Sequence, residues 1–106
     1  MFLLLAALMQ MASAVPVKAV DGIKPEELNW YLAGLFDATR QWNPIPPRSV
    51  CIEKLGLLGF TRHFLNLSAN FKTLPANDKA RIAFENAEMS SVAELIIERE
   101  CGVYRQ

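Results

Sequence analysis

The chain contains two cysteines, Cys51 and Cys101, and a bond between them would join two points that lie about 50 residues apart. Closing a loop of that length stabilises a fold by about 4 kcal/mol in the chain-entropy model, because the cross-link restricts the unfolded chain. A chain of 106 residues has a small core, so a contribution of this size constrains its architecture strongly. The two thiols pair only in an oxidising compartment, so a disulfide between them requires that the chain be exported.

The first 14 residues predict export. An unbroken apolar run covers residues 2–9, and residues 12–14 form the small-x-small pattern of a cleavage site, although no Lys or Arg precedes the run. The run is shorter than the roughly 20 residues that cross a bilayer, so no stable membrane insertion is expected. We therefore expect residues 1–14 to be a signal peptide, the mature chain to begin at Val15, and the two cysteines to form a disulfide. A buried N-terminal helix is the alternative.

Residues 15–106 are expected to form a single domain, because so short a chain has no room for a second core. Its formal charges balance, so it lacks the basic surface that nucleic-acid binding requires. Cations prevail in the middle of the chain and carboxylates near its end, and we interpret both groups as solvated faces of two helices that attract each other. The residues are Arg48, Lys54, Arg62 and Lys72 in the middle, then Asp78, Glu85, Glu88, Glu94, Glu98 and Glu100.

The most regular pattern, over residues 25–42, predicts an amphipathic helix. Pro25 suits the first helical position, and two glutamates follow where negative charge favours the helix dipole. Gly34 costs about 1 kcal/mol relative to alanine, and we interpret it as a point where another helix approaches closely. The preceding residues, 15–24, predict an irregular lead-in. The apolar stripe recurs at three- and four-residue spacing and comprises Leu28, Tyr31, Leu32, Leu35, Phe36, Thr39 and Trp42.

Three further helical segments are predicted after the rigid proline-rich connector at residues 43–47. The first covers about residues 53–68, with two glycines in its first turn, and the next starts at Pro75. Ser91 and Glu94 fit a capping box that restarts the last helix, which Gly102 ends, although one continuous helix over residues 75–101 is the alternative. The fold class is therefore all-α, a small helical bundle of about four helices with one disulfide.

Each of these segments carries its own expected apolar face. The faces are Leu57, Leu58, Phe60, Phe64, Leu65 and Leu67 in the first segment, Ile82, Ala83, Phe84 and Ala87 in the second, and Met89, Val92, Ala93, Ile96 and Ile97 in the last. Four aromatic residues of the first helix, Trp30, Tyr31, Phe36 and Trp42, are also expected in the core. Any of them left exposed would be a candidate anchor for a binding partner.

The sequence contains no recognisable set of catalytic residues. Cys51 and His63 are the only starting point for a Cys–His hydrolase, and the predicted disulfide removes that thiol. One histidine and two oxidised cysteines cannot supply three or four metal ligands, so no metal and no cofactor is expected. We interpret His63 as a structural residue at or near the surface, and we do not expect an enzyme.

The order of four short motifs resembles the periplasmic immunity proteins of type VI secretion amidase effectors, of the Rap/Tai type. The motifs are the segment Tyr31-Leu32-Ala33-Gly34-Leu35-Phe36-Asp37-Ala38, then Val50-Cys51-Ile52, then Leu74-Pro75, and a last helix that closes on Cys101. In this order they cover nearly all of residues 15–106. The chain lacks the second cysteine pair that the family often carries, and Trp30 stands at a usual glycine.

The resemblance implies a non-enzymatic periplasmic inhibitor that binds a peptidoglycan-cleaving amidase and occludes its active-site cleft. It also implies a homodimer, and structural roles for Tyr31, Gly34, Asp37, Ala38 and Pro75, with Asp37 as a buried hydrogen-bonding group. No toxin-binding residue can be assigned, because the contacting loops of the family match no fixed motif here. Two alternatives remain: a small periplasmic holdase that exposes apolar surface in acid, and a secreted structural or interaction protein unrelated to toxins.

Overall fold

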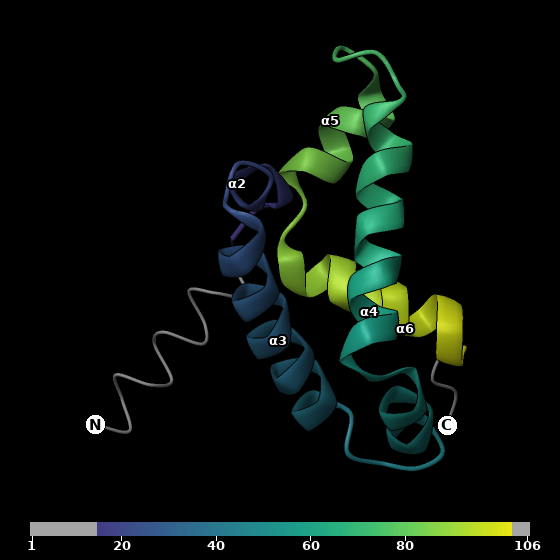
Figure 1. Ribbon diagram of the computed structural model, residues 1–106. Helices are drawn as coiled ribbons and strands as arrows, with labels where there is room; N and C mark the ends of the chain where they lie inside the picture. Colours follow the sequence, from purple (N-terminus) through teal and green to yellow (C-terminus); the bar gives the residue numbers. More distant parts are fainter. Residues whose placement is uncertain (1–14, 103–106) are drawn as a thin grey trace.

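Five helices make up residues 15–102, the part of the chain that the computed structural model describes (Figure 1). They are α2 (Val17–Val20), α3 (Pro25–Trp42), α4 (Arg48–Lys72), α5 (Lys79–Asn86) and α6 (Met89–Cys101). Within this range the only β-type pairing is an isolated bridge between Pro16 and Glu88. The predicted all-α bundle is therefore confirmed, whereas the predicted signal peptide lies outside the described residues.

Helix α3 has the bounds that its sequence pattern predicts. Lys24 is extended and Pro25 occupies the first turn, where no backbone N–H is needed. One face is buried, and it consists of Leu32, Leu35, Phe36, Ala38 and Thr39. The periodic apolar stripe thus identified both the helix and most of its packing face.

Helix α4 is longer than predicted and consists of two helical segments that meet at Gly56. This glycine has φ 67° and ψ 171°, a left-handed region that side chains with a Cβ rarely adopt, so the chain changes direction there. The buried face is also narrower than predicted, because Leu57, Leu58 and Leu65 are 40, 73 and 48% exposed. Among the apolar residues of the predicted face, the structure buries Phe60, Phe64 and Leu67.

Helices α5 and α6 are separate, and each begins at a residue that the sequence patterns did not predict. Helix α5 begins at Lys79 rather than Pro75, because the Asp78 carboxylate accepts a hydrogen bond from the Ala80 N–H at 2.8 Å and caps the helix. Helix α6 begins at Met89 after the extended residue Glu88, which has no side-chain cap bond. The predicted capping box of Ser91 and Glu94 and the continuous helix over residues 75–101 are therefore both wrong.

The reason for this break lies in the segment before α3. The Val15 carbonyl accepts a hydrogen bond from the Met89 N–H at 2.9 Å, and the Val17 N–H donates to the Ala87 carbonyl at 3.0 Å. This pairing holds the α5–α6 link in an extended form. Residues 15–24 are thus not an irregular lead-in, since they contain α2, whose Val17 and Val20 are buried.

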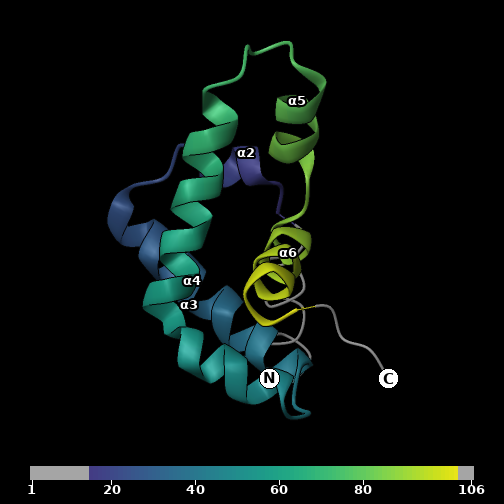
Figure 2. The same cartoon turned by 90° about the vertical axis from the view of Figure 1, so that its right-hand side faces the viewer.

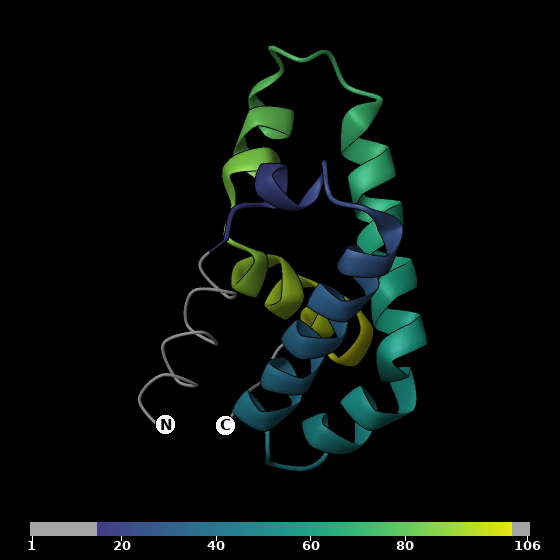
Figure 3. The same cartoon turned by 60° about the vertical axis from the view of Figure 1, so that its left-hand side comes forward.

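Helix α6 packs against both α3 and α4, and these two helices also pack against each other. Figures 2 and 3 show α6 crossing the lower half of the bundle while α2 lies beside α5 in the upper half. The predicted stripe of α6 is confirmed, because all five of its residues are buried: Met89, Val92, Ala93, Ile96 and Ile97. Gly102 ends the helix with φ 79°, as predicted.

Candidate functional site

The predicted disulfide is present between Cys51, in the first turns of α4, and Cys101, the last residue of α6, and their Cα atoms are 5.8 Å apart. The bond ties the start of α4 to the end of α6. A covalent tie at this point fixes where the outer face of α6 lies relative to the connector that precedes α4.

A buried arginine reinforces the same junction. Arg48 is only 8% exposed, and its Nη2 donates to the Glu94 carboxylate at 2.8 Å while Nη1 donates to the Gly102 carbonyl at 3.2 Å. The Asn43 amide donates to the other Glu94 oxygen at 3.2 Å and to the Thr39 carbonyl at 2.8 Å. Glu94 is therefore held by Asn43 of the connector, which is itself bonded to α3, and by Arg48 of α4, and these two contacts fix its carboxylate.

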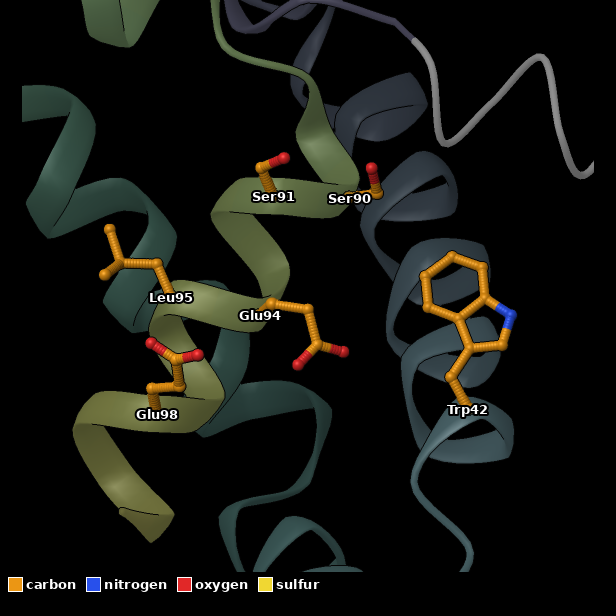
Figure 4. Close-up of a pocket in the computed structure, with 6 residues that line it drawn as sticks. All are labelled: Trp42, Ser90, Ser91, Glu94, Leu95 and Glu98. Carbon is orange, nitrogen blue, oxygen red and sulfur yellow. The ribbon is translucent and has the colours of Figure 1, made fainter. Parts of the chain in front are cut away.

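This fixed carboxylate forms one wall of an open hollow of about 710 Å³, which we call the Trp42 hollow. Figure 4 shows the Trp42 indole at the end of α3 with the edge of its six-membered ring toward α6, and the Glu94 carboxylate turned toward it. The hollow follows the outer face of α6 over two turns. Its lining residues are Trp42, Ser90, Ser91, Glu94, Leu95 and Glu98.

The lining of the Trp42 hollow is aromatic and acidic. Arg48 compensates the charge of Glu94, whereas no side chain within residues 15–102 pairs with the Glu98 carboxylate. None of the described residues that line the hollow is basic. The arrangement offers an aromatic face, an uncompensated negative charge and two hydroxyl groups to whatever binds there.

Trp42 and Trp30 are exposed, so the prediction that both belong to the core is wrong. Trp42 is 50% exposed, because it is the last residue of α3 and lines the open hollow on the outer face of α6. Trp30 is 81% exposed, because it lies on the side of α3 opposite the buried face. Phe36 is buried as predicted, and Tyr31 is half-buried, where burial raises the pKa of its hydroxyl to about 12.

Two residues of the family motif, Gly34 and Asp37, do not have the surroundings that we predicted for them. Gly34 is exposed, and a Cβ added there would meet nothing within 4 Å, so no described helix approaches it closely. Asp37 is exposed and pairs with Arg40 at 2.6 Å, so it is not a buried hydrogen-bonding group. Both lie on the solvent face of α3 because the opposite face packs on α4 and α6. Ala38 is buried on that packing face, and Pro75 is exposed in the turn before α5.

A second, smaller hollow of about 460 Å³ lies between α3 and the bend of α4. Asp37 and Arg40 line it from α3, and Glu53, Gly56 and Leu57 line it from α4. Asp37 and Arg40 pair with each other and Glu53 has no pairing side chain within residues 15–102, so this hollow, like the Trp42 hollow, has one uncompensated carboxylate, but it is smaller and its described lining contains no tryptophan. We therefore take the Trp42 hollow as the candidate site.

The structure places the single histidine outside both hollows. His63 is half-buried, and its Nε2 lies 2.5 Å from the Glu100 carboxylate, which links α4 to the end of α6. Within residues 15–102, no group of three or more His, Cys, Asp or Glu side chains is arranged to hold a metal ion. In the same range, no helix is long and apolar enough to cross a membrane.

Sequence reasoning missed the parts of the site that depend on contacts between distant residues. Arg48 was interpreted as solvated and Glu94 as a cap, yet they pair across 46 residues. The sequence contained one signal for this pair, the uneven distribution of charge. We expected the cationic middle of the chain and its acidic end to attract each other. The hollow itself had no sequence signal, since Trp42 continued the apolar stripe of α3.

Fold and site together define a small helical protein with one disulfide and an aromatic, acidic surface hollow. No protein-family model, no curated protein and no solved structure matches this chain. The function is therefore inferred from the residues of the site and from the family resemblance of the sequence motifs.

Proposed function

We propose that this protein is an exported, periplasmic binding protein that inhibits a peptidoglycan amidase delivered by type VI secretion. In this proposal the Trp42 hollow is part of the surface that meets the toxin. The single observation that carries the proposal of a binding role is a half-exposed tryptophan held beside a fixed carboxylate on the outer face of α6.

The chemistry of Trp42 supports a role in binding. Tryptophan is enriched among the few interface residues that contribute most to affinity, because its ring removes a large apolar area from water on binding. The disulfide and Arg48 already fix α6 and Glu94 before any partner arrives. Binding to such a preorganised surface costs less conformational entropy than binding to a mobile one.

The identity of the partner comes from the resemblance to amidase immunity proteins. The ordered motifs around Tyr31, Cys51, Pro75 and Cys101 cover nearly all of residues 15–106. The family motifs and the physical reasoning from the lone cysteine pair both predict a disulfide between Cys51 and Cys101, and this disulfide is present. An inhibitor of a cell-wall enzyme must act where the wall is cut, which agrees with the predicted signal peptide.

A holdase is the second candidate, and the outer face of α4 favours it. Leu58 and Leu65 are 73 and 48% exposed, and they lie seven residues apart on the same side of the helix. An apolar surface of this kind is what a holdase offers to unfolded chains. The two candidates differ in specificity, because an inhibitor recognises one folded enzyme and a holdase binds many unfolded ones.

The test is to express an amidase encoded next to this chain in the periplasm and to follow lysis. The amidase is paired with the full chain, with residues 15–106 alone, or with full chains carrying Trp42→Ala or Trp30→Ala. We expect protection from the full chain and from Trp30→Ala, weaker protection from Trp42→Ala, and none from the version without residues 1–14. Both variants remove an exposed tryptophan, but only Trp42→Ala changes the hollow. A difference between them therefore measures the contribution of the hollow.

Protection by both the exported and the unexported chain would contradict action in the periplasm. Absence of protection by every version, together with suppression of the aggregation of an unrelated unfolded protein, would favour the holdase. A Leu58→Ser and Leu65→Ser double variant would then lose that suppression.

A further inference from the structure

We propose that the Trp42 hollow binds the guanidinium group of an arginine side chain that the partner protein presents. The identity of the partner rests on the proposed function, whereas the chemistry of the occupant rests on the hollow alone. Three features support an arginine: the aromatic face, the charge of the lining and the openness of the hollow.

The aromatic face is the indole of Trp42, which stands on the α3 side of the hollow with its ring toward α6 (Figure 4). A cation over an indole ring is attracted by the negative face of the π-system, and tryptophan is the strongest partner among the aromatic residues. Arginine is favoured over lysine there, because a planar and weakly hydrated guanidinium stacks on an aromatic ring.

The charge of the lining selects a cation. Within residues 15–102, Glu98 has no pairing side chain and no basic residue lines the hollow. Each Glu94 oxygen accepts one described hydrogen bond, from Asn43 or Arg48, and a carboxylate oxygen can accept a second. A guanidinium stacked on Trp42 can donate to the remaining acceptor positions of Glu94, which is turned toward the indole, while Glu98, on the far side of Glu94, adds its negative charge to the hollow.

The same lining opposes an apolar occupant. Among the described lining residues, Leu95 is the only aliphatic one, and the lining also contains two carboxylates and two hydroxyls. Covering these polar groups with an apolar side chain would remove their water without replacing its hydrogen bonds, which is unfavourable. Because the hollow is open, a free small cation would bind weakly, so the expected occupant is a side chain held in place by a larger protein interface.

The experiment isolates Trp42 as the only tryptophan by using the full-length protein, purified after export, with Trp30→Phe. N-acetyl-arginine amide is titrated into it, and Trp42 fluorescence and the indole N–H resonance report binding. N-acetyl-citrulline amide is the matched ligand, with nearly the same shape and no charge. We expect saturable binding of the arginine compound at millimolar concentration, about two- to five-fold tighter than that of the citrulline compound.

Two variants in the same background locate the effect. Glu98→Gln should remove most of the preference for arginine over citrulline, because it removes the uncompensated charge. Glu53→Gln, a change of the same kind at an exposed carboxylate outside the hollow, should leave the preference unchanged. Added salt should weaken the arginine compound and leave the citrulline compound nearly unaffected.

Equal binding of the two compounds, equal effects of the two glutamate variants, or no response of Trp42 to either compound would overturn the inference. Selective arginine binding in a protein that binds no neighbouring amidase would leave the inference standing and contradict the proposed function. The two failures are therefore distinguishable.

Discussion

The two ends of α4 are held in different ways. At its start, the Cys51–Cys101 disulfide and the buried Arg48–Glu94 pair join it to α6. At its other end, the chain turns into α5, whose eight residues include a single buried one, Phe84. The ring of Phe84 stacks on Phe71 of α4 with the centroids 4.3 Å apart and the planes 8° apart.

The difference indicates which end of the molecule is suited to binding. The Trp42 hollow lies at the cross-linked end, where a covalent bond and a buried charge pair fix α6 before a partner arrives. The end with α5 has little buried apolar surface, and local unfolding starts in such regions. Four measurements test this contrast, from the largest expected effect to the smallest, and the contrast fails if the two ends respond alike.

The largest effect is expected at the disulfide. Cys51→Ser should lower the free energy of unfolding by about 4 kcal/mol, since the cross-link closes a loop with a sequence separation of 50. Under oxidising conditions, the variant should then unfold at the same temperature as the reduced wild-type protein. Free-thiol labelling of both cysteines in the exported native protein, or equal melting temperatures for oxidised and reduced wild type, would contradict this assignment.

A smaller and local effect is expected at the opposite end. Phe84→Ala should cost up to about 3 kcal/mol, because it removes a buried ring that stacks on Phe71. Amide hydrogen exchange should show lost protection in α5, with α6 near Ile96 largely unchanged. An equal loss of protection in α5 and α6 would show that the bundle opens as one unit and that the two ends do not differ.

The next largest change in the free energy of unfolding is expected from a matched pair of glycine substitutions. Gly56→Ala should destabilise the protein by about 1 to 2 kcal/mol, because the bend of α4 requires a positive φ at this position. Gly34→Ala should stabilise it by about 1 kcal/mol, because Gly34 is helical and a Cβ there meets nothing. Urea denaturation measures both, and a loss of stability in Gly34→Ala would mean that another chain approaches α3 there.

The smallest stability effect is expected from Trp30→Phe, the background change used to isolate Trp42. Trp30 is 81% exposed, so its replacement should change the free energy of unfolding by less than about 0.5 kcal/mol. The same urea titration measures it. A loss of 1 kcal/mol or more, on the order of a buried side chain, would show that Trp30 is covered in solution, by a second copy for example.

The fold class, the bounds of α3, the buried stripe of α6 and the disulfide could be predicted from the sequence. Each depends on local or pairwise information, namely apolar periodicity, the helix preferences of proline and glycine, and a lone cysteine pair. The start of α6 could not be predicted in this way. It is set by the pairing of Val15 and Val17 with the α5–α6 link, a contact between segments about 70 residues apart.

The candidate site was harder to predict than the fold. Periodicity assigned Trp42 to the core because it continues the apolar stripe of α3, and this assignment was wrong, because periodicity carries no information about whether another helix covers the end of the stripe. Ser91 and Glu94 have the spacing of a capping box, yet Glu94 binds Arg48 instead. The sequence predicted only that any exposed aromatic residue would be a candidate anchor for a partner. Which aromatic residues are exposed is known from the structure, and Trp42 is one of them.

The central claim is that the Trp42 hollow is the surface through which this protein binds an amidase. The most direct test is the affinity of the oxidised, exported protein for an amidase encoded beside it, measured by calorimetry with Trp42→Ala and Trp30→Ala as the matched pair. The account predicts that Trp42→Ala weakens binding by about 30-fold, as expected for a central aromatic residue, and that Trp30→Ala changes it by less than about two-fold. Unchanged affinity in Trp42→Ala, or equal losses in both variants, would contradict it.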